Sequence, residues 1–151
     1  MKNLLEKILD CLNKNQLTKA LDLCEKNKDK NIEHIILNIK GVIFFKQKKF
    51  EFAKFNFNKS KYLKEDFLYP YKNLYQLHLK TKEFEIAIKN IKKIIELEKN
   101  QNPISIFNLG LAYDLSKNYS KAIETYKIIE DNNFKEKRSE EHTSELQSPC
   151  N

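Results

Sequence analysis

The sequence predicts an all-α fold, an α-solenoid of stacked antiparallel helical hairpins, on three observations. Two glycines and three prolines in 151 residues are too few turn residues for an all-β protein. Apolar side chains recur at the three- and four-residue spacing of amphipathic helices. Four alanines, Ala20, Ala53, Ala87 and Ala122, follow one another at intervals of 33, 34 and 35 residues. A period of this length is typical of helical repeats.

The composition excludes several classes of protein. No stretch approaches the roughly 18 consecutive apolar residues of a membrane span. Glu6, Lys7 and Asp10 interrupt the N-terminal segment where a signal peptide needs an apolar core, so we predict a cytoplasmic protein. The net charge of +7 comes from lysines spread along the chain and mixed with acids. That pattern indicates a solvated surface and gives no strong nucleic-acid signal.

The first predicted hairpin, about residues 1–33, carries the repeat least clearly. Ile8 stands twelve residues before Ala20, and Cys11 stands nine residues before it. A small residue where two helices cross, with larger residues one turn away, is what close packing of a helix pair requires. The same arrangement is expected in every unit.

The second predicted hairpin, about residues 34–67, contains the aromatic run KFEFAKFNF. The alternation of a strand fails between Phe52 and Phe55, which lie three residues apart, so we predict a helix. Phe50 and Phe57 lie seven residues apart and are expected on its inward face.

The third and fourth hairpins, about 68–102 and 103–136, differ in clarity. In the third, Tyr75 and His78 replace the small residue and the aromatic found in the second and fourth units, and we predict His78 as a buried structural histidine. The fourth starts with Asn102-Pro103, a pair suited to a helix N-cap and first helical position.

This pattern resembles the tetratricopeptide repeat (TPR), a unit of about 34 residues with large, small and aromatic residues at fixed offsets. The resemblance covers nearly all of residues 1–137. The fourth and second repeats carry it best, through Leu109, Gly110, Tyr113, Tyr119, Ala122 and Tyr126 and through Leu37, Gly41, Phe44, Phe50, Ala53, Phe57 and Ser60. It implies a right-handed superhelix with the first helix of each hairpin on the concave side. The implied function is a protein-protein interaction scaffold.

The resemblance also implies a partner-binding groove. The first-helix offsets that line the groove in this family fall here on Asn38, Val42, Phe45, Tyr69, Lys72, Asn73, Gln76, Phe107, Asn108 and Leu111, with Ile35, Leu79 and Ile104 beside them. Asn73 and Asn108 share one offset, and an amide can both donate to and accept from a peptide unit. Asparagine is abundant in this chain, so coincidence is an equally good interpretation of that match.

An outer aromatic patch is expected on the second repeat. Phe52 and Phe55 project away from the inward face, joined by Tyr62 about two turns on. The patch is either a tolerated packing surface or a contact for self-association or another partner, since grouped exposed aromatics are unusual on a monomer.

The last fourteen residues differ from the rest. Residues 1–137 contain no arginine, whereas residues 138–151 begin with Arg138 and contain no lysine. The run RSEEHTSELQS resembles a translated sequencing-library adapter, so we treat 138–151 as a non-native tail, disordered or artefactual. We expect the natural chain to differ after Lys137.

Few residues point to catalysis. Cys11, Cys24 and Cys150 lack metal-cluster spacing and an even disulfide count, so we predict buried reduced thiols. No glycine-rich phosphate loop is present, and we predict no enzyme, metal or cofactor in residues 1–137. Two alternatives are the N-terminal targeting array of a larger enzyme such as a transferase and, less favoured, an RNA-binding helical repeat protein.

Overall fold

A computed structural model describes the backbone of residues 3–99 and 102–145 and the side chains up to residue 132. This part of the chain contains a 3-10 turn (Lys30–Ile32) and eight helices: α1 (Leu4–Asn13), α2 (Leu17–Glu25), α3 (Glu33–Lys46), α4 (Phe50–Leu63), α5 (Leu68–Lys80), α6 (Phe84–Glu98), α7 (Pro103–Leu115) and α8 (Tyr119–Glu145). It contains no strand, so the all-α prediction is confirmed.

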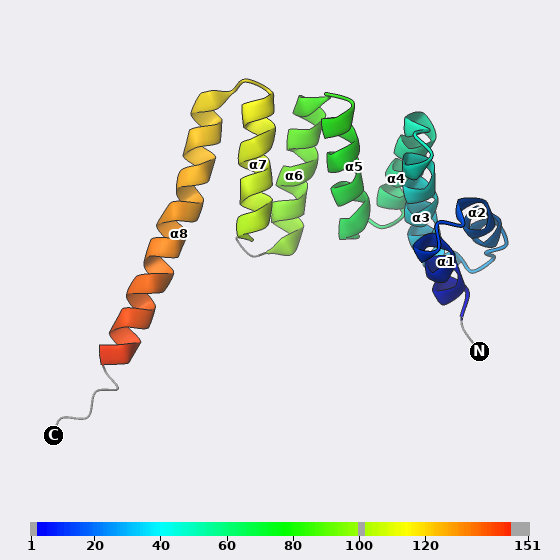
Figure 1. Cartoon of the computed structure of the whole chain (residues 1–151), viewed down its shortest axis with the longest axis horizontal. Coiled ribbons are helices and arrows are strands. Elements are labelled where there is room, and N and C mark those ends of the chain that lie inside the picture. Colours follow the sequence, from blue (N-terminus) through cyan, green and yellow to red (C-terminus); the bar gives the residue numbers. More distant parts are fainter. Residues whose placement is uncertain (1–2, 100–101, 146–151) are drawn as a thin grey trace.

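The helices pack as a stack of hairpins. Each helix contacts chiefly its neighbours in the chain, within the pairs α1–α2, α3–α4, α5–α6 and α7–α8 and between successive pairs. Figure 1 shows the hairpins in a row from the N-terminal to the C-terminal end. Such a row, in which each repeat touches only its neighbours, is an α-solenoid.

The periodic small residues mark the helix crossings. The four period-setting alanines are 0 to 3% exposed. A Cβ added to Gly41 would lie within 3.0 Å of three ring atoms of Phe57, and one added to Gly110 would lie equally close to Tyr126. The two helices of each of these hairpins therefore approach through a glycine and an aromatic ring, as the repeat pattern predicts.

The turns inside the hairpins repeat as well. Asn15, Lys48, Lys82 and Lys117 have φ between 54° and 62°, in the left-handed region. The residue after each one donates its N–H to the carbonyl oxygen five residues earlier, at 2.8 to 2.9 Å. This is the Schellman geometry that usually employs glycine. These turns could not be predicted from the sequence, because lysine and asparagine occupy the position where glycine is expected.

Two helix starts have side-chain caps. Asn3 and Glu6 form a reciprocal capping box at the start of α1. The Asn102 side chain accepts a hydrogen bond from the N–H of Ile104 at 3.1 Å, with Pro103 in the first turn of α7. The predicted N-cap of the fourth hairpin is confirmed.

The first hairpin is shorter than the others. Helices α1 and α2 have 10 and 9 residues, whereas α3 to α7 have 13 to 15. Cys11 and Cys24 are buried free thiols in the core shared with α3, as predicted, and burial raises the pKa of Cys24 to about 11. Cys150 lies outside the described residues.

Helix α8 is the longest, at 27 residues, and Figure 1 shows it extending past the end of α7. Residues 138–145, which the sequence assigns to the tail, form its last turns. Residues 146–151 lie outside the described part of the chain.

Candidate partner-binding face

The first helices of the last three hairpins lie next to one another. Asn73 of α5 donates its Nδ2 to Oδ1 of Asn38 in α3, at 2.9 Å. The Tyr75 hydroxyl of α5 donates to the carbonyl oxygen of Asn108 in α7, at 2.8 Å. Burial raises the pKa of Tyr75 to about 12, so this hydroxyl keeps its proton at neutral pH. We call the predicted groove residues on α3, α5 and α7 the first-helix face.

Three large apolar side chains of the first-helix face lie exposed. Tyr69 is 62% exposed, Ile104 is 70% exposed and Phe107 is 52% exposed. Val42, Phe45 and Leu111 are half-buried. Ile104 and Phe107 lie three residues apart and so share one face of α7, and exposed apolar side chains on a common face are characteristic of an interaction site.

A pocket of about 280 Å³ opens between α3 and α5. Its lining combines four predicted residues with two others: Val42, Phe45, Asn73 and Gln76, with Lys46 and Phe57. Phe57 comes from α4, and its ring reaches the pocket because Gly41 leaves room for it. The sequence predicts Phe57 only as a core residue. Gly41, which faces the Phe57 ring, was the signal that could have placed this ring at the pocket.

The amides of the first-helix face differ in what they can offer a ligand. Asn38 is 8% exposed, and its oxygen is already occupied by Asn73. Gln76 is exposed and lines the pocket. Within the described residues, the half-buried Asn108 side chain makes no hydrogen bond. Asn73 and Asn108, which share one offset, therefore have different surroundings.

Glu98 of α6 links three helices through Lys72 of α5 and Ser105 of α7. The Lys72 Nζ lies 3.1 Å from Oε1 of Glu98, and the Ser105 hydroxyl donates to Oε2 of Glu98 at 2.6 Å. Burial alone would raise the pKa of Glu98, but the hydrogen bonds from Ser105 and Lys72 outweigh it and lower that pKa. The Glu98 carboxylate thus ties α6 to both α5 and α7, and Lys72 is its partner on α5.

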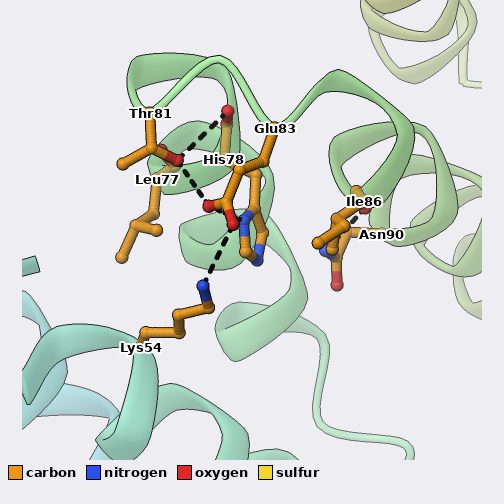
Figure 2. A network of polar contacts seen from close by, with 7 residues as sticks. All are labelled: Lys54, Leu77, His78, Thr81, Glu83, Ile86 and Asn90. Carbon is orange, nitrogen blue, oxygen red and sulfur yellow. Dashed lines mark hydrogen bonds and ion pairs between the residues drawn. The ribbon is translucent and has the colours of Figure 1, made fainter. Parts of the chain in front are cut away.

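A polar network joins the second and third hairpins at the α5–α6 turn. Figure 2 shows Thr81, His78 and Lys54 converging on the carboxylate of Glu83, at 2.6, 2.8 and 3.1 Å. His78 is 2% exposed, which confirms its prediction as a buried structural histidine. Hydrogen bonds from Thr81, His78 and Lys54 lower the pKa of Glu83 to about 2. From the sequence, Glu83 is expected as a solvated acid on a polar helix face, and its position five residues after a buried histidine was the signal for this network.

The predicted outer aromatic patch is exposed. Phe52 is 60% exposed, Phe55 is 65% exposed and Tyr62 is 83% exposed. The Phe52 ring lies 5.4 Å from that of Phe44. An open cavity of about 540 Å³, which we call the outer hollow, is lined by Lys40, Phe44, Glu51, Phe52, Phe55 and Asn56. Tyr62 is not part of that lining.

The described residues hold no group of three or more His, Cys, Asp and Glu side chains placed to share a metal ion. Across the same part of the chain, every helix is too short or too polar to cross a membrane.

Comparison with known proteins identifies the fold. No protein-family model and no curated sequence matches the chain. Solved structures of MamA do match: a MamA RS-1 ArsTM double mutant (20% identity, 85% of this chain, 72% of that one, TM-score 0.72), a second MamA crystal structure (16%, 89%, 79%, 0.73) and MamA 41-end from Desulfovibrio magneticus RS-1 (16%, 95%, 90%, 0.70). The fold is a TPR-like helical solenoid. Identities of 16 to 20% establish that fold and nothing further.

Proposed function

We propose that this chain is a non-enzymatic interaction module that binds a peptide or helix of a protein partner across α3, α5 and α7. The observation that carries the proposal is the first-helix face, where exposed Tyr69, Ile104 and Phe107 lie beside amide side chains. Apolar side chains give a partner surface to bury, and amides pair with its backbone.

The pocket between α3 and α5 supplies an anchor point. Its walls are aliphatic and aromatic at Val42, Phe45 and Phe57, and polar at Asn73 and Gln76. A volume of about 280 Å³ suits one large apolar side chain better than a whole ligand. We therefore infer that the partner inserts one such side chain here and extends over α5 toward Phe107 of α7.

A random peptide library displayed on phage, selected on the full chain, tests the proposal. Peptides enriched on the wild type should bind a Phe107→Ala, Asn108→Ala variant at least about tenfold more weakly, because truncating a central aromatic removes over 1.4 kcal/mol. The matched control, Asn58→Ala with Tyr62→Ala, removes an exposed amide and an exposed aromatic from α4 and should change nothing. Equal binding to both variants would refute the site.

A further inference from the structure

The outer hollow lies on a face of α4. The equivalent face of α6 lies against the preceding hairpin. One period of 34 residues after Phe52, Phe55, Asn56 and Lys59 come Ile86, Lys89, Asn90 and Lys93. The two faces are equivalent in detail: Asn56 and Asn90 are each 7% exposed and donate Nδ2 to the carbonyl oxygen four residues earlier, at 2.8 and 2.9 Å. Figure 2 shows the second of these asparagines beside Ile86.

The two equivalent faces have different neighbours. On α6 the face lies across a cavity of about 370 Å³ from three residues of the preceding second helix, α4: Lys54, Asn58 and Lys61. The outer hollow on α4 is lined by α3 and α4 alone, without a residue from α2. Helix α2 has nine residues, against 14 in α4 and 15 in α6. Helix α2 reaches only the Lys59 end of this face, where Cys24, Glu25 and Lys59 line another cavity. The part of the face around Phe52 and Phe55 therefore lacks the neighbour that its equivalent on α6 has.

The uncovered face is also the more apolar of the two. Phe55 stands where α6 has Lys89, and Phe52 stands where α6 has Ile86. Both phenylalanines are more than half exposed. Exposure of such rings to water is unfavourable, because burial of apolar surface lowers the free energy. A partner that covers them removes this unfavourable exposure.

We propose that a second copy of this chain covers the outer hollow, with the two α4 helices antiparallel about a two-fold axis near Phe55. The argument is charge complementarity. Glu51 precedes Phe55 by four residues and Lys59 follows it by four, so all three lie on one helix face. A two-fold axis at Phe55 places Glu51 of each copy opposite Lys59 of the other. Neither side chain is in an ion pair with another described residue.

The exposed aromatic surface of α4 limits the strength of the dimer. Phe52, Phe55 and Tyr62 are 60, 65 and 83% exposed. At about 200 Å² for each aromatic side chain, they offer roughly 400 Å² per copy. A stable interface buries about 800 Å² per partner, so this one is weak and forms at high protein concentration.

Sedimentation equilibrium of the full chain, from about 10 μM to about 1 mM, tests the dimer. The weight-average mass of the wild type should rise from the 18.0 kDa of one chain toward twice that value. A Phe52→Glu, Phe55→Glu variant should stay at 18.0 kDa with unchanged helicity by circular dichroism. A wild type that stays monomeric throughout would overturn the proposal and leave the hollow to a different partner.

A charge exchange tests the geometry with variants that leave the core intact. Glu51→Lys and Lys59→Glu should each raise the concentration needed for dimerisation about threefold to tenfold, because each places like charges opposite one another. The two substitutions in one chain should restore wild-type association, since the pair then attracts with its signs reversed. Failure of the combined variant to recover would exclude the antiparallel two-fold arrangement. Dimerisation by the Phe52→Glu, Phe55→Glu variant would exclude this face.

Discussion

Replacing Glu83 by glutamine tests how the second and third hairpins are held together. The carboxylate accepts hydrogen bonds from Thr81, His78 and Lys54, which lower its pKa from 4.5 to about 2. A shift of that size corresponds to about 3 kcal/mol of stability when fully expressed. Because the side chain is 34% exposed, solvent screening reduces the expected loss to about 1 to 2 kcal/mol at pH 7.

The loss should depend on pH in one direction. A carboxyl whose pKa is lowered by folding stabilises the protein above its ordinary pKa, and that contribution disappears as the pH falls from 4.5 toward 2. Urea unfolding of the full chain, followed by circular dichroism at several pH values, measures the difference. Glu85→Gln, an exposed acid in the same first turn of α6, is the control and should cost less than about 0.5 kcal/mol. An equal loss of unfolding free energy for Glu83→Gln and Glu85→Gln, or a loss independent of pH, would show that the hydrogen bonds to Glu83 do not stabilise the fold.

Two further substitutions test the hairpin geometry by thermal or urea unfolding. Gly41→Ala should destabilise by up to about 2 kcal/mol, because overpacking against the buried Phe57 ring costs about 1 to 3 kcal/mol and the helix-propensity gain offsets only about 1 kcal/mol of it. An increase in stability would show that the ring moves aside. Lys48→Gly should instead stabilise by about 1 kcal/mol, because glycine adopts the left-handed φ of 60° without strain. Lys46→Gly, in the last turn of α3, is the control and should destabilise.

The period of the alanines was sufficient to predict the hairpins. Each alanine is buried where two helices cross, and Gly41 and Gly110 leave space for a ring of the partner helix. Such positions leave a signal in the sequence because only small side chains fit. The turns left none, because lysine and asparagine adopt the left-handed conformation there at a modest cost.

The hydrogen bonds and ion pairs between side chains at the first-helix face could not be predicted from the sequence. The repeat offsets assigned residues of α3, α5 and α7 to the first-helix face. They did not predict that Asn73 donates a hydrogen bond to Asn38 or that Lys72 pairs with Glu98. Those contacts depend on how far successive hairpins rotate, which the spacing within one repeat does not determine. The spacing likewise does not determine that α2 ends after nine residues and that the outer hollow around Phe52 is lined by α3 and α4 alone.

Chemical-shift mapping shows which helices bind the partner. A peptide selected on the full chain is titrated into the isotope-labelled protein, and backbone amide shifts are followed along every helix. We expect changes concentrated on α3, α5 and α7, including Gln76 and Asn108, with saturation at one peptide per chain. Changes concentrated instead on the outward faces of α4 and α6, with the first-helix face unperturbed, would contradict the proposal that the partner binds the first-helix face.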